Sequence, residues 1–567
     1  MAGDALHYNF SSFMPEATDA RNTMQIVTII LILVLSVVLC GFIARLKWVP
    51  VSLPLIQIAA GTVLASIGDV RLPLDPDIFF LLFIPPLLFL DGWRIPKGAF
   101  FSDAVPILTL AIGLVLFTVA GMGFFIEWLI PAVPLAVAFA LGAILSPTDP
   151  VAVSAIAAGN PIQPRLMHIL EGESLLNDAS GLVCFHFAVA AAITGHFSVR
   201  AASFNFLQEA GGGIAVGLAL SWAVGWINRW LVSKVGEEPG LQILISLLIP
   251  FAAYMGAEQV GGSGILAAAA AGISMHYADL IGRPLAATRM QRSAVWDTMQ
   301  LVLNGVIFVI LGAQLPSTIA SLASATDDLG VGSAWRLPLY VVAITAALTF
   351  LRFFWVLVSM RLTLSAKRND ATPRQRPSLR LLLVAAFAGV RGAVTLAGIL
   401  TLPLFMPDGS YFPARDLVIF LAMGVILLSL LLASIALPLL TKGMVYALPV
   451  RTSSEEADAR TAAADAAIRK LEQICTEKPN SNPEKQLQVV AATNLIKGYR
   501  RRLAYGESSN EEAVQMRQLA KAERMLRLQA LNAERDELYI RSIAGKLDDQ
   551  IHHRLLREID LLEATLE

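Results

Sequence analysis

Residues 171–183 read EGESLLNDASGLV, and they place three carboxylates, a serine and an asparagine within eight positions. The chain on both sides is mostly apolar, with RLMHIL before and CFHFAVAAAI after. Because an α-helix turns about 100° per residue, Glu171, Ser174 and Asp178 fall on one helix face, at roughly 0°, 300° and 340°. The stretch therefore predicts a membrane helix with one polar stripe. The alternatives are a soluble amphipathic helix and a polar network that only stabilises a helix bundle.

The composition of the chain divides it into an apolar part and a charged tail. Of its 567 residues 15% are charged, whereas a soluble protein carries about 25%. Residues 451–567 contain 39 of the 87 charged side chains. The net charge of −1 and the lack of a nucleotide motif give no indication of a nucleic-acid or nucleotide partner. The three cysteines have no metal-ligand spacing, and we expect no cofactor.

The apolar part predicts thirteen membrane helices, since each span needs about 20 mainly apolar residues. Their approximate bounds are 23–44, 50–67, 77–92, 104–130, 134–158, 165–195, 208–235, 240–258, 263–277, 294–315, 335–362, 380–403 and 415–441. With the N-terminus outside, the inner loops hold eighteen Lys and Arg residues and the outer side holds five, a positive-inside bias. We therefore expect an extracytoplasmic segment 1–22, a transmembrane domain 23–450 and a helical cytoplasmic tail 451–567.

The fifth predicted span contains AILSPTDPVAVSAI, in which Pro147 and Pro150 bracket Thr148 and Asp149. Proline removes a backbone donor and clashes with the preceding turn, so this pair predicts a helix break. Unwound backbone at membrane depth is tolerated where it is buried in protein or lines an aqueous cavity. The freed carbonyls, the carboxylate and the hydroxyl are hard oxygen ligands suited to a small cation. An ordinary proline kink is the alternative.

The twelfth predicted span contains AAFAGVRGAVTLAGIL, where Gly389 and Gly392 weaken the helix around Arg391. Charged groups within a span mark an ion path or a buried pair. Arg352, which lies deep in the preceding span, is expected to extend to the inner membrane surface. The two interrupted spans run in opposite directions, which is typical of transporters built from inverted repeats.

Five stretches together resemble the NhaP/NHE-type monovalent cation:proton antiporters. They are IPPLLFLDGW, SPTDPVAV, GESLLNDASGLV, NGVIFVILGAQL and FAGVRGAVTLA, spread over residues 80–400. The resemblance implies an all-α, inverted-repeat, NhaA-like fold with two crossed, broken helices. It also implies a core formed by helices around 77–195 and 294–403, and a homodimer in the bacterial inner membrane.

The family's residues can be carried over one by one onto matching positions. The resemblance implies a Na⁺ site formed by Thr148, Asp149, Ser174 and Asp178, with Asn177 beside it. It also implies a structural charge pair between Glu173 and Arg391. The role of Glu171 is left open.

Asp178 is the side chain for which a proton and a cation are expected to compete. An isolated charge in an apolar surrounding is unfavourable, so either a proton or a cation neutralises it. Asn177, in place of a second aspartate, resembles the family's electroneutral branch and implies one-for-one exchange of Na⁺, or else Li⁺ or K⁺, for H⁺. The alternatives are a K⁺/H⁺ antiporter and a gated cation channel. A membrane-bound enzyme is disfavoured because no nucleophile–base pair is present.

The tail has the pattern of helices over about 455–476, 484–505 and 511–542. Its mixed charge and modest apolar stripes are equally consistent with a regulatory or dimer-stabilising part and with a solvated helical extension.

Overall fold

The structure is a computed structural model that describes residues 15–46, 51–68, 76–95, 97, 104–149, 153, 164–195, 199–282, 284–325, 335–366, 378–442, 450–476, 483–507, 511–543 and 549–566. The chain divides into two compact units, Met1–Met444 and Val445–Glu567. The first unit contains the apolar part of the sequence, and the second contains the charged tail.

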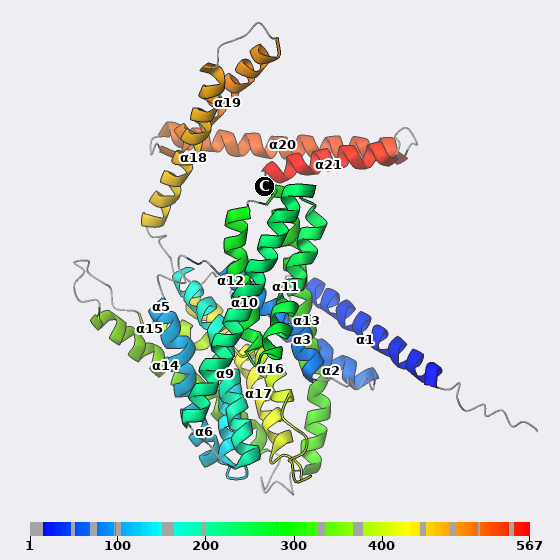
Figure 1. The fold of residues 1–567 in the computed structure, drawn as a ribbon, viewed down its shortest axis with the longest axis vertical. Coiled ribbons are helices and arrows are strands. Elements are labelled where there is room, and N and C mark those ends of the chain that lie inside the picture. The colour runs from blue at the N-terminus through cyan, green and yellow to red at the C-terminus, as the bar shows by residue number, and fades with distance from the viewer. Residues whose placement is uncertain are drawn as a thin grey trace, which may run out of the picture. The chain divides into compact units, whose positions relative to one another are not determined.

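The described part of the first unit is a bundle of helices, and most of their axes lie roughly parallel or antiparallel to one another (Figure 1). Its helices are α1 (Pro15–Ala44), α2 (Leu53–Gly68), α3 (Pro76–Arg94), α5 (Ala104–Leu108), the π-helix η2 (Thr109–Leu114), α6 (Val115–Leu129), α7 (Leu135–Ile144), α9 (Pro164–Thr194), α10 (Val199–Val235), α11 (Pro239–Gln259), α12 (Gly264–Gly282), α13 (Ala286–Ala325), α14 (Arg336–Ala366), α15 (Leu379–Phe387), α16 (Ala393–Leu400) and α17 (Arg415–Thr441). Within the described residues the only β-structure is an isolated bridge between Phe405 and Tyr411. The predicted all-α class is confirmed for this part of the chain.

Membrane-spanning character is clear for many of these helices. Among the described helices, eight are long and apolar enough to cross a membrane. Two shorter apolar helices, α2 and α7, accompany them. Each predicted span overlaps a helix of the bundle, but thirteen membrane crossings and an inverted repeat stay predictions.

Helical geometry is lost at two places in the bundle where the sequence predicts weak points. The chain leaves helical geometry after α7 and remains non-helical through Asp149, a segment that includes Pro147. Pro150 lies outside the described residues. Between α15 and α16 the chain is also non-helical, and this second break contains Gly389 and Gly392.

Close helix packing fixes the bundle around these breaks. Helices α2 and α13 approach so closely that a Cβ atom at Gly61 would overlap the carbonyl oxygen of Val309. A Cβ atom at Gly312 would likewise overlap the carbonyl oxygen of Ile58. In a bilayer, helix association depends on such backbone proximity because lipid tails are as apolar as leucine.

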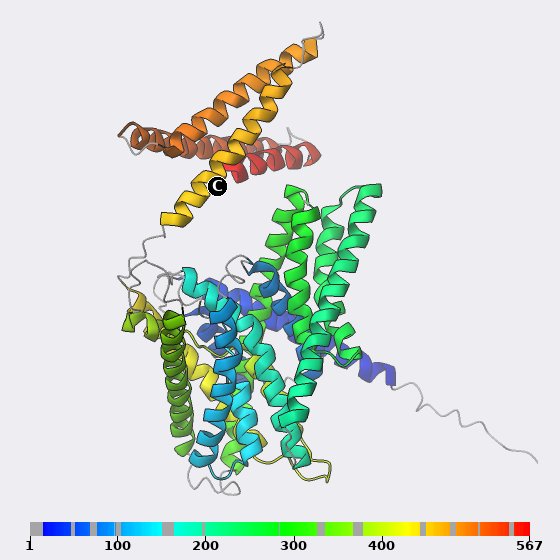
Figure 2. The same ribbon diagram turned by 60° about the vertical axis from the view of Figure 1, so that its left-hand side comes forward.

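The second unit consists, in its described residues, of two helical hairpins (Figure 2). Helix α18 (Val450–Thr476) packs against α19 (Pro483–Glu507), and α20 (Glu511–Ile543) packs against α21 (Asp549–Leu566). The guanidinium of Arg535 on α20 bonds the carboxylates of Asp560, at 2.9 Å, and Glu563 on α21. The sequence predicted the first three helices and missed α21.

Replacing Gly312 with alanine should destabilise the first unit, because α2 and α13 must separate to admit the added methyl group. We expect a loss of about 1–3 kcal/mol in the free energy of unfolding, read as a lower melting temperature in detergent. The matched control is Gly41→Ala in α1, where an added Cβ would meet no atom within 4 Å. Equal melting temperatures for the two variants would contradict the close approach of α2 and α13.

Candidate functional site

The two interrupted helices touch at their breaks. The backbone N–H of Asp149 donates a hydrogen bond of 2.8 Å to the carbonyl oxygen of Val390. Gly392 lies so close to the Asp149 carboxylate that a Cβ atom at this position would overlap it. Any side chain larger than hydrogen at position 392 would therefore push the breaks apart. This crossing places a carboxylate beside the N-terminal end of α16, whose partial positive charge favours it.

Arg391 binds the ends of two half-helices. Its Nε donates to the carbonyl oxygen of Leu145, at the end of α7, over 3.0 Å. Its Nη1 donates to the carbonyl oxygen of Gly389, just after α15. The residue is 3% exposed. Helix C-termini bear partial negative charge, so the guanidinium offsets two such ends at once.

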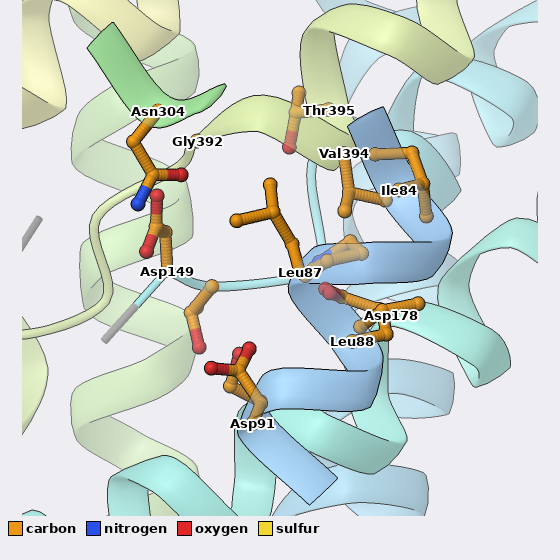
Figure 3. A pocket seen from close by; sticks show the side chains of 13 residues that line it. Ile84, Leu87, Leu88, Asp91, Asp149, Asp178, Asn304, Gly392, Val394 and Thr395 are labelled. Carbon is orange, nitrogen blue, oxygen red and sulfur yellow. The ribbon is translucent and has the colours of Figure 1, made fainter. Parts of the chain in front are cut away.

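A cavity of about 40 Å³ lies beside the crossing, within the bundle (Figure 3). Its polar lining residues are Asp91, Thr148, Asp149, Ser174, Asp178, Asn304 and Thr395. The volume is sufficient for a small number of water molecules or for a partly hydrated monovalent cation. The four residues implied as the cation site, Thr148, Asp149, Ser174 and Asp178, thus line one cavity together.

Asp178 and Ser174 come from the polar stripe of α9, as the helical periodicity predicts. They are 7% and 5% exposed. Within the described part of the chain, the carboxylate of Asp178 makes no hydrogen bond and no ion pair. The ionised form of a buried carboxylate without a protein partner is energetically unfavourable, so it requires a proton or a cation from outside the protein.

A second polar network stands beside the cavity, and protein groups neutralise both of its charges. The guanidinium of Arg352 on α14 binds both carboxylate oxygens of Glu173, at 2.5 and 2.8 Å. Thr148 donates to Glu173 over 3.3 Å, and Asn177 donates to Thr148 over 3.0 Å. Arg352 also donates from Nε to the carbonyl oxygen of Ala385. The chain of bonds joins α9 to α14, to α15 and to the segment after α7.

The predicted salt bridge between Glu173 and Arg391 is wrong in its basic partner. Glu173 pairs with Arg352, and both side chains are almost completely buried. Arg391 instead binds backbone carbonyls at the crossing. The prediction that Arg352 extends to the membrane surface is wrong for the same reason, because its guanidinium points into the bundle, where Glu173 neutralises it.

Asp91, Asn304 and Thr395 were not singled out from the sequence, yet they line the cavity. Figure 3 shows Asp91 on α3 at one end of the cavity and Thr395 on α16 at the other. For Asp91 a signal existed, since an acid that ends the apolar run IPPLLFL is unusual at membrane depth. Asn304 and Thr395 are uncharged, and no periodicity marks them.

A cavity that gathers carboxylates and hydroxyls beside non-helical segments of a membrane bundle is typical of ion transporters. The sequence profile of the sodium/hydrogen exchangers, for their transmembrane part, matches residues 30–443, and the chain belongs to this family. Its function class is therefore cation/proton antiport by a multi-pass membrane protein, which is transport rather than enzyme catalysis.

Individual relatives agree with this assignment. The chain is 41% identical over 549 residues to the uncharacterized Na⁺/H⁺ exchanger YjcE of Escherichia coli, covering 96% of this chain and 99% of the relative. It is 38% identical over 549 residues to the sodium, potassium, lithium and rubidium/H⁺ antiporter of Bacillus pumilus, covering 95% of this chain and 78% of the relative. The family resemblance recognised in the sequence is thus confirmed.

A solved structure shares the fold. The sodium proton antiporter MjNhaP1 of Methanocaldococcus jannaschii matches with a TM-score of 0.57 at 18% identity, over 74% of this chain and 99% of that structure. This similarity concerns the arrangement of the helices.

Neutralising either Glu173 or Arg352 should destabilise the protein strongly, because the remaining charge loses its partner in the interior. We expect Glu173→Gln and Arg352→Gln each to lower the free energy of unfolding by about 3–5 kcal/mol. The double variant should lose less than the sum, since paired residues are coupled. A second cycle with Glu173→Gln and Arg391→Gln, read by the same thermal melts, serves as the control. Stronger coupling in that second cycle would contradict the Glu173–Arg352 pairing.

Proposed function

We propose that the protein exchanges Na⁺, together with Li⁺ or K⁺, for H⁺, and that cation and proton compete for the carboxylate of Asp178. The observation that supports this is the buried Asp178 side chain, which has no protein partner in the described residues and faces a cavity beside two crossing breaks. Thr148, Asp149 and Ser174 line the same cavity and supply oxygen ligands of the kind that alkali cations prefer.

The stoichiometry we propose is one cation for one proton. Asn177 cannot titrate, and its side-chain amide is held by Thr148. Asp149 lies against the start of α16, where the partial positive charge of the helix N-terminus favours its carboxylate. One-for-one exchange then requires Asp178 alone to change its protonation during the cycle.

Broad selectivity among alkali cations fits the size and lining of the cavity. A space of about 40 Å³ exceeds a single bare ion, and its ligands are carboxylates, hydroxyls and an amide rather than a rigid ring of carbonyls. The Bacillus pumilus relative is named for four alkali cations. A K⁺/H⁺ antiporter is the second candidate, and the same lining favours it over a gated channel.

We propose a domain organisation that follows the division of the chain into an apolar part and a charged tail. Residues 23–450 would form the transport domain, with its core around 77–195 and 294–403 and with the remaining helices as scaffold. The N-terminal segment 1–22 would lie outside, and the tail 451–567 in the cytoplasm. We propose a homodimer in the plasma membrane as the working assembly.

Replacing Asp178 with asparagine should abolish exchange, because the amide can neither hold a transported proton nor neutralise a cation. The measurement is proton movement driven by a Na⁺ or K⁺ gradient in proteoliposomes, and we expect the rate to fall to that of empty vesicles. Asp408→Asn, on the exposed turn before α17, is the matched control and should transport normally. Transport at the native rate by Asp178→Asn would rule out its role.

Exchange should generate no membrane potential. Proteoliposomes that contain a potential-sensitive dye and a Na⁺ gradient should show proton flux without a dye response. Collapsing the potential with the permeant anion thiocyanate, which is not a substrate of the proposed exchange, should leave a Na⁺-driven rate unchanged. A voltage-dependent rate would show that a second group also carries a proton, and Asp91, which lines the same cavity, is then the candidate.

A further inference from the structure

Two buried side-chain oxygens beside the proposed ion path lack hydrogen-bond partners in the described part of the chain. They are Oδ1 of Asn177 and Oγ1 of Thr395, and both residues are 1% exposed. The other atom of the Asn177 amide donates to Thr148, so this side chain is held by the polar network. Thr395 makes no side-chain hydrogen bond there. An unsatisfied buried hydroxyl is destabilising, and its persistence at a cavity wall needs a reason.

The position of Thr395 explains why its hydroxyl has no partner within its own helix. Threonines inside a helix usually donate to the carbonyl four residues earlier, as Thr345 donates to Val341 on α14 over 2.8 Å. Thr395 lies in the first turn of α16, and the residue four positions earlier, Arg391, is in the non-helical break. No helical carbonyl is therefore in reach.

The hydroxyl faces the cavity instead. Thr395 is one of its lining residues, and Figure 3 shows the Oγ1 atom directed from α16 toward the interior. Asp178 reaches the same cavity from α9, and Asp149 reaches it from the break after α7. Thr395 thus adds a neutral oxygen from a third element of the chain.

We propose that the Thr395 hydroxyl is a ligand of the transported alkali cation, which it contacts directly or through one water that the cation carries. The proposal rests on the proposed exchange at Asp178 and names a residue that sets its affinity for cations. Valine has the same shape as threonine and would leave no unsatisfied group, so the hydroxyl serves the cavity rather than the fold.

A neutral ligand distinguishes the two competitors for Asp178. A proton forms a covalent O–H bond with the carboxylate and needs no third oxygen, whereas a cation leaving water must replace several oxygen ligands at once. Removal of the Thr395 hydroxyl therefore weakens cation binding and leaves proton binding unchanged. Li⁺ and Na⁺, which hold their hydration most strongly, are affected more than K⁺.

The test is a set of variants in proteoliposomes, measured with Li⁺, Na⁺ and K⁺ at several concentrations. Thr395→Val should raise the KM for Na⁺ by about tenfold, as expected for one lost polar ligand, with kcat close to native. Its melting temperature should equal or exceed that of the native protein. Thr395→Ser should keep the native KM. Thr345→Val removes a buried hydroxyl that is satisfied within α14, and it should leave the KM unchanged.

An unchanged KM in Thr395→Val for all three cations overturns the proposal. A rise in KM that Thr345→Val shares to the same extent overturns it as well, because it would reflect general loosening of the bundle. Asp178→Asn is measured in the same preparation, so that failure of the Thr395 assignment can be distinguished from failure of the proposed exchange at Asp178. If the native protein exchanges cations and Asp178→Asn is inactive, an unchanged KM in Thr395→Val contradicts only the assignment of Thr395 as a ligand. If Asp178→Asn exchanges normally, the proposed function fails first.

Discussion

The contact between the two interrupted helices is the constraint on which the rest of the site depends. One backbone hydrogen bond, from Asp149 to Val390, joins the breaks, and Arg391 binds the carbonyl ends of the half-helices around them. Glycine at position 392 is what allows this approach. Because helix dipoles converge at the crossing, charged side chains become tolerable at membrane depth. The cavity lies beside this contact, where both chain segments are non-helical and their side chains do not fill the space between the helices.

The charges near the crossing divide into engaged and available groups. Glu173 and Arg352 neutralise each other in a bidentate pair, and Arg391 is occupied by carbonyl oxygens. Asp178, in contrast, has no protein partner within the described residues and lines the cavity. A transporter needs this separation, since groups that hold the fold must keep their charge while one group exchanges its counter-ion. Asn177 and Thr148 connect the engaged network to the cavity wall without adding a titratable group.

Helical periodicity and helix-breaking residues predicted the polar stripe of α9 and the two non-helical segments, whereas the set of candidate cation ligands came from the family resemblance. Prolines and glycines located both breaks, and the 100° rotation per residue placed Ser174 and Asp178 together. The contact partners of these side chains on other helices could not be predicted in this way, because a helical wheel gives the face on which a side chain lies and not the helix that packs against that face. The family resemblance implied Arg391 as the partner of Glu173, and helical periodicity alone could not replace it with Arg352. Thr395 was missed because an uncharged residue has no signature in an apolar span. Helix α21 was also missed.

Competition between a proton and a cation at Asp178 is the central claim, and proton release on cation binding tests it most directly. Purified protein in weakly buffered detergent solution is mixed with NaCl, and released protons are counted with a pH indicator while calorimetry counts bound Na⁺. Competition predicts one proton released for each Na⁺ bound by the native protein, with both signals lost in Asp178→Asn. Binding of Na⁺ without release of protons would contradict it.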